Sequence, residues 1–227
     1  MKKITLLALS LLLPFFMYAQ WSFLVTVAGG VASENSVTPS TPGSPGASLS
    51  AYSRVGYALQ GGFEADYFFS CSRLGLGTGI FYSHNRSLQT KEANPFWQLH
   101  DKYWHAESIR IPVNLLIGLG KKRRSVLLFG LAGNFNLRHH DYDLPDVTSI
   151  TYRDNPFFVG IQTGYKYKWG KRFEVGVLLY RDVSWFLNQI FYSDSQGTVD
   201  LNMIYHRYYH TAQVTFSYRF GGSGAEK

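Results

Sequence analysis

The chain has 227 residues, of which 22 are basic and 15 acidic, and aromatic side chains make up 17% of it. Beyond the first twenty residues, no apolar run reaches the roughly 18 residues of a membrane-spanning helix, which excludes a helical membrane protein. The basic residues form no single stripe, which argues against a nucleic-acid-binding surface. The many aromatic residues and the 22 glycines instead favour a β-rich protein.

Residues 1–19 have the layout of a secretory signal peptide. Lys2 and Lys3 precede an apolar run over residues 4–17, and a small residue stands next to the expected cleavage point. An uncleaved membrane anchor is the alternative. That run is shorter than the roughly 20 residues that span a bilayer, and Pro14 interrupts it. We therefore expect export and removal of this segment.

Eight segments alternate between apolar and polar residues with the period of two that is typical of β-strands. In the last of them, TAQVTFSYRF, every second side chain is apolar and those between are polar. In chain order, the predicted strands cover residues 21–31, 54–68, 74–82, 108–119, 126–138, 156–167, 173–181 and 211–220.

The connections between these strands alternate strictly in length. Short links (SCSR, GKKRRS and WGKR) follow the second, fourth and sixth strands, and the long links cover roughly residues 34–53, 84–107, 139–155 and 182–207. Bacterial outer-membrane barrels arrange periplasmic turns and external loops in this way. Soluble lipocalin-type barrels, the alternative with eight up-and-down strands, follow no such rule.

The predicted fold class is all-β: an eight-stranded antiparallel up-and-down transmembrane β-barrel with short periplasmic turns and long extracellular loops. The barrel is expected over residues 20–220, in the outer membrane of a Gram-negative bacterium, with a flexible tail over residues 221–227. Cys71 is the only cysteine, which excludes a disulfide within the chain.

The polar faces of the predicted strands carry three acids and three bases. Eight strands enclose an interior just wide enough for side chains to fill, and buried charges need partners. We therefore predict a plugged lumen with inward glycines and a charge network of Glu64, Asp66, Arg110, Lys166, Glu174 and Arg219. Pro112 cannot donate to a strand ladder, so a bulge is expected there.

Three segments resemble the PorT-like outer-membrane β-barrel family: IRIPVNLLIGLG (109–120), SVLLFGLAGNFNL (125–137) and the closing VTFSYRF. The corresponding family patterns are (L/I)-E-I-P-L, Y-x-x-x-G and Y-R-F. Arg110 stands where the family usually has an acid, and Leu116 where a lysine is common. The resemblance implies an outer-membrane protein without a catalytic residue to map, and one branch of the family assists protein secretion. Tyr218 and Phe220 resemble the signal by which the barrel-assembly machinery recognises its clients.

Two chemical alternatives concern the long links. His139 and His140, with Asp141 and Asp143, could supply nitrogen and oxygen ligands to a metal, although polar residues gather in any solvated loop. No cofactor is predicted.

The segment WHAES contains His105, Glu107 and Ser108, the residue types that lipid A deacylases of the outer membrane use as a triad. Attack by serine needs histidine within hydrogen-bond reach. A spacing of three puts His105 and Ser108 on opposite strand faces. A lipid-modifying enzyme of the outer membrane is therefore kept only as the alternative.

We expect a non-enzymatic barrel that serves envelope structure, surface-loop binding or secretion support. The expected partners are outer-membrane lipid and lipopolysaccharide, the barrel-assembly machinery during insertion, and an extracellular ligand or secretion component. No nucleic acid is expected.

Overall fold

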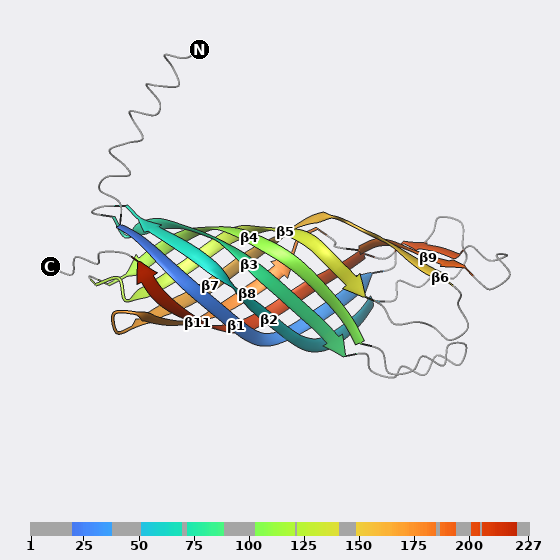
Figure 1. Ribbon diagram of the computed structural model, residues 1–227, viewed down its shortest axis with the longest axis horizontal. Helices are drawn as coiled ribbons and strands as arrows, with labels where there is room; N and C mark the ends of the chain where they lie inside the picture. The colour runs from blue at the N-terminus through green and yellow to red at the C-terminus, as the bar shows by residue number, and fades with distance from the viewer. Residues whose placement is uncertain are drawn as a thin grey trace, which may run out of the picture.

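A computed structural model describes residues 20–37, 51–69, 72–88, 103–120, 122–140, 149–184, 187–193, 201–204 and 206–221. Eight strands close into a barrel in the order β1-β11-β8-β7-β5-β4-β3-β2, with every neighbouring pair antiparallel (Figure 1). They are β1 (Gln20–Val37), β2 (Ala51–Phe68), β3 (Leu74–Leu88), β4 (Tyr103–Leu119), β5 (Ser125–His140), β7 (Phe157–Trp169), β8 (Phe173–Asp182) and β11 (His206–Gly221). The predicted fold class is confirmed. No helix in this part of the chain is long and apolar enough to cross a membrane.

Several strands run further than the sequence predicted, and the longest extensions are toward the long connections. β1 continues to Val37, β3 continues to Leu88, and β4 begins at Tyr103. These three strands have 18, 15 and 17 residues, whereas a tilted strand crosses a bilayer in about 9–11. The barrel wall therefore extends beyond the lipid at the end that carries the long connections.

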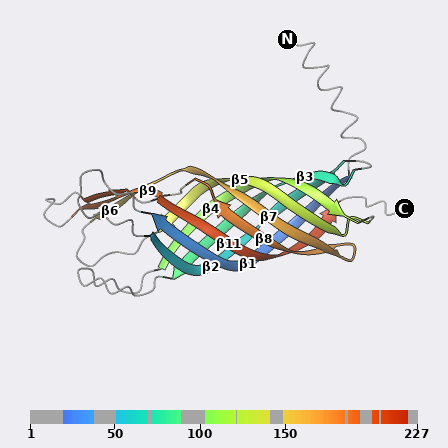
Figure 2. The ribbon, with the colours of Figure 1, turned by 180° about the vertical axis from the view of Figure 1, so that it is seen from behind.

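Three further strands lie in the long connections: β6 (Ser149–Asp154), β9 (Leu187–Ser193) and β10 (Leu201–Ile204). They form a separate sheet in the order β10-β9-β6. Figures 1 and 2 show β6 and β9 projecting beyond the barrel end opposite to the start of β1. The sequence analysis assigned residues 139–155 and 182–207 to long links and identified none of these three strands. β6 pairs with β9 from a distant link, which the pattern within either link does not reveal, and β10 pairs with β9 within the same link.

The two faces of the barrel wall have opposite polarity. Along β1, the exposed fraction is 55% for the outward Val27 but 4% for its inward neighbour Thr26. Along β11, Val214 and Phe216 are exposed while Gln213 is buried. This arrangement is the reverse of a water-soluble barrel, and it suits a hydrocarbon solvent around the wall.

Tight turns close the short-link end. Gly120 and Gly170 both have φ of 73°, in the left-handed region that favours glycine, and Arg123 has φ of 47°. The amide of Lys168 donates to the carbonyl of Arg124 at 2.7 Å, which links the end of β7 to the turn between β4 and β5.

The bulge expected at Pro112 is not there. The β3–β4 ladder is interrupted between the pairs Thr78↔Val113 and Phe81↔Arg110, but the register is the same on both sides. Proline lacks the amide proton for this ladder, and the Thr78 hydroxyl instead donates to the Pro112 carbonyl at 2.9 Å. The register shift of β4 lies between Glu107 and Ser108, on its β5 side.

Candidate functional site

The interior of the barrel is crossed by an ionic contact. Lys166 on β7 donates to Glu64 on β2, and its ammonium nitrogen is 3.5 Å from Oδ2 of Asp66. β7 and β2 are four strands apart in a ring of eight, so they form opposite walls. The Thr26 hydroxyl is 3.3 Å from Oε2 of Glu64 and 2.8 Å from the Ser217 hydroxyl, which joins β1 and β11 to the same cluster.

A second predicted pair lies between adjacent strands. Arg219 on β11 donates to Glu174 on β8, and Glu174 is buried. The structure thus brings five of the six predicted charged residues into two ionic clusters inside the barrel.

Arg110, the sixth, has no carboxylate partner among them. It is the largest fully buried side chain of the described residues, with 1% of its surface exposed. Its Nε donates to Asn134 at 2.9 Å and a terminal nitrogen donates to Gln60 at 3.0 Å. The guanidinium carbon lies 3.6 Å from the centre of the Tyr180 ring. Amide oxygens and an aromatic face therefore replace the expected acid.

The network continues to a buried acid that the sequence analysis missed. Tyr180 accepts a hydrogen bond from Asn134 at 2.8 Å and donates to Asp182. Asp182 also accepts from the backbone amide of Tyr209 at 2.7 Å and is 2% exposed. The predicted strand ended at residue 181, one residue short. The alternation of Glu174, Gly176, Leu178 and Tyr180 continues to Asp182 and could have located it.

Tyr180 occupies space that a glycine leaves open. A Cβ atom at Gly160 would lie 2.2 Å from the Tyr180 hydroxyl oxygen, which is closer than atoms can approach. Gly160 on β7 therefore makes room for a ring from the neighbouring strand, as expected of inward glycines.

An apolar cluster fills the interior at the short-turn end. It consists of Phe68, Leu116, Val126, Leu128 and Leu178. The Lys168 ammonium and the Arg123 guanidinium lie 5.3 and 5.6 Å from the Phe68 ring centre. The barrel interior therefore contains a packed apolar cluster next to the polar networks, and cationic side chains cover this cluster.

The residues of the deacylase-like segment separate as their spacing predicts. Ser108 faces the interior and is buried, while His105 lies on the outer face. There, the His84 and His105 rings are 5.8 Å apart and Nδ1 of His84 is 3.6 Å from Oε1 of Glu107.

The candidate metal ligands fall largely outside the described structure. His139 and His140 end β5, but their side chains are not described, and Asp141 and Asp143 lie outside the described residues. Within the residues that are described, no group of three or more His, Cys, Asp or Glu side chains is arranged to hold a metal ion.

Aromatic side chains gather on the outer face of β1, β2, β8 and β11 near the short turns. Ring centres are 5.1 Å apart for Trp21 and Tyr67 and 6.4 Å for Phe23 and Phe220. Phe173 and Tyr218 are 5.5 Å apart. Aromatic girdles of this kind mark the membrane–water interface. Both residues of the predicted assembly signal, Tyr218 and Phe220, belong to this girdle.

The sequence matches no protein-family model and no curated protein. In structure, the chain is similar to OprG from Pseudomonas aeruginosa, with a TM-score of 0.50 and 12% identity over 90% of this chain and 99% of that one. It is also similar to neisserial surface protein A, with a TM-score of 0.46 and 13% identity over 87% and 97% of the two chains. The fold is that of an outer-membrane β-barrel. Together with the apolar outer face, this fold places the protein in the outer membrane of a Gram-negative bacterium.

Proposed function

We propose that this protein is a non-enzymatic outer-membrane barrel that conducts no ions and works through its external end. The observation that carries the proposal is the contact of Lys166 with Glu64 from opposite walls. A pair that reaches across the ring leaves little free cross-section beside it, because eight strands enclose only enough space for side chains.

The external end offers the larger surface. β1, β2 and β4 continue past the length that lipid requires, and β6, β9 and β10 add a sheet beyond the barrel. In this proposal the filled barrel is a rigid frame. The long connections bind an extracellular ligand or a secretion component, and the frame holds them at the cell surface.

Conductance across a planar lipid bilayer tests the filled lumen. The folded wild-type protein is expected to give no ion-current steps in a bilayer where an open porin, added afterwards, gives them readily. Reproducible steps from the wild-type protein, with folding verified by heat-modifiable gel migration, would overturn the proposal.

Membership in the PorT-like family is part of this proposal. It is supported by the family-like segments on β4 and β5, which pair with each other, and on the closing strand β11. The secretion-support role of one family branch predicts that a secretion component co-purifies with the detergent-solubilised protein after crosslinking. If only lipid and assembly factors are recovered, the surface-binding role is favoured instead.

A further inference from the structure

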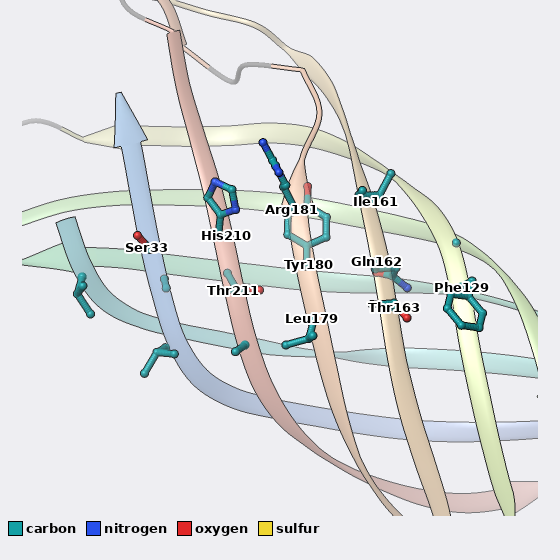
Figure 3. Close-up of a pocket in the computed structure, with 15 residues that line it drawn as sticks. Ser33, Phe129, Ile161, Gln162, Thr163, Leu179, Tyr180, Arg181, His210 and Thr211 are labelled. Atoms are coloured by element: carbon teal, nitrogen blue, oxygen red, sulfur yellow. The ribbon is translucent and has the colours of Figure 1, made fainter. Parts of the chain in front are cut away.

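A groove of about 730 Å³ crosses the outer surface of the barrel over β1, β11, β8, β7 and β5, with Val55 of β2 at one end (Figure 3). Two rows of outward side chains form the sides of the groove, and the backbone of the inward-facing residues between them forms its floor. Each row consists of residues that are paired across neighbouring strands. Five neighbouring strands about 4.8 Å apart make the groove roughly 19 Å wide across the wall.

The row nearer the short turns is apolar except for Thr163, which lies between Leu179 and Phe129. Val31, Leu179 and Phe129 are about half exposed, and Ala212 is paired with Val31 on one side and Leu179 on the other. Because the Ala212 side chain is a single methyl group, it leaves a depression between two larger neighbours. The depression can hold hydrocarbon chains against the barrel wall.

The row nearer the long connections is polar at its centre and ends in Val55 on one side and Ile161 on the other. Ser33, His210 and Arg181 are successive partners in the strand register, so a hydroxyl, an imidazole and a guanidinium lie side by side (Figure 3). His210 is ten residues from Phe220, which belongs to the aromatic girdle. At about 3.3 Å per residue and a tilt of about 40°, His210 lies about 25 Å above the girdle, the height of the apolar band of such barrels. This row is therefore at the headgroup level of the outer leaflet.

The polar row has no opposing charge on its own surface. Among the described side chains, the outer faces of β1, β5, β7, β8 and β11 carry no carboxylate, because Glu34, Glu174 and Asp182 point inward. On the far side of the barrel, by contrast, the outward Glu107 lies beside His84. The groove thus combines an apolar trough with a cationic edge.

We propose that this groove binds one molecule of lipid A from the outer leaflet, with a phosphate on Arg181 and His210 and acyl chains over Ala212. The guanidinium fork matches a phosphate group in shape and charge. The width across five strands suits a lipid with several chains side by side, which favours lipid A over a two-chain phospholipid. The inference is independent of the proposed closed lumen.

Native mass spectrometry of the full-length mature protein in detergent tests this site. The probes are bis-phosphorylated lipid A, the same lipid without phosphates, and phosphatidylglycerol. Arg181→Gln is expected to weaken binding of phosphorylated lipid A about fivefold. Ala212→Phe, which fills the trough, is expected to weaken it about tenfold through the displaced chain methylenes. Heat-modifiable migration verifies that each variant is folded, and Ala212→Leu replaces Ala212→Phe if the larger ring prevents folding.

Two matched controls lie away from the groove. Arg124→Gln removes an exposed cation from a short turn, and Ala65→Phe enlarges an outward alanine on β2; both are expected to bind lipid A like the wild type. Lipid A without phosphates should bind more weakly and lose its sensitivity to Arg181→Gln. The proposal is wrong if phosphatidylglycerol binds as tightly as lipid A, or if either groove variant binds lipid A like its control.

Discussion

Lys166 on β7 makes its ionic contact with Glu64 on β2, the strand farthest from it around the ring. Asp66 lies on the same side of this contact, 3.5 Å from the lysine nitrogen. One cation therefore neutralises two buried carboxylates, and its removal leaves both without this counter-charge in the low-dielectric interior.

Lys166→Met should destabilise the folded barrel by about 3–5 kcal/mol, the range for removing one partner of a buried ion pair. Urea unfolding in lipid vesicles, followed by tryptophan fluorescence, measures the loss. Lys171→Met, in an exposed short turn, is the matched control and should have little effect. Adding Glu64→Gln and Asp66→Asn to Lys166→Met should restore part of the stability. A loss below about 1 kcal/mol would show that water or another cation compensates the carboxylates.

Gly160→Ala should destabilise the barrel by about 1–3 kcal/mol, because the added methyl group overlaps the Tyr180 ring and forces a repacking. Gly61→Ala is the matched control, since a Cβ there meets no atom within 4 Å. A double-mutant cycle with Tyr180→Ala identifies the cause: the glycine substitution should cost clearly less when the ring is absent. Equal costs in both backgrounds would mean that the glycine acts through the backbone alone.

Phe220→Ala should reduce the assembly of the barrel in cells severalfold. The refolding yield of the purified protein should not fall by a comparable factor. The physical reason is that the assembly machinery is expected to bind the exposed ring. The fraction of heat-modifiable protein in outer-membrane extracts measures assembly, and refolding into detergent measures intrinsic folding. Phe216→Ala removes an equally exposed ring of β11 and is the control. If both variants assemble equally well, the terminal ring is not a signal.

Ser108→Ala and His105→Ala should leave the lipid A acylation pattern of expressing cells unchanged. The two side chains lie on opposite sides of the barrel wall, so the serine cannot pass its proton to this histidine. Mass spectrometry of extracted lipid A, compared with cells that lack the protein, gives the readout. An acyl chain that is lost with the wild-type protein and retained with Ser108→Ala would establish the enzymatic alternative.

The eight barrel strands could be predicted because one physical rule acts on all of them. Each strand has lipid on one side and a packed interior on the other, so alternation is visible in the sequence, as in residues 211–220. The same rule located the inward Glu64, Asp66 and Lys166. It fails where the solvent changes: at the level of the lipid headgroups, the outer face of β1 becomes polar at Ser33, and the predicted strand ended early.

The partners inside the lumen could not be predicted in the same way. Alternation assigns Arg110 to the inner face but gives neither its height nor the side chains opposite, which depend on strand tilt and stagger around the ring. Asn134, Gln60 and Tyr180 come from three other strands. The strand β6 depends on pairing with β9 from a distant link, which leaves no local pattern.

The closing pair of strands brings the two ends of the barrel segment together. Phe23 is paired with Gly221, so β1 begins beside the end of β11. A short linker could join these ends, and the chain could then be opened at the turn around Gly170 to give a circular permutant. Such a permutant would keep the same pairing between neighbouring strands but would move Phe220 away from the chain terminus. It would therefore show whether assembly depends on the geometry of the barrel or on the order in which its strands are synthesised.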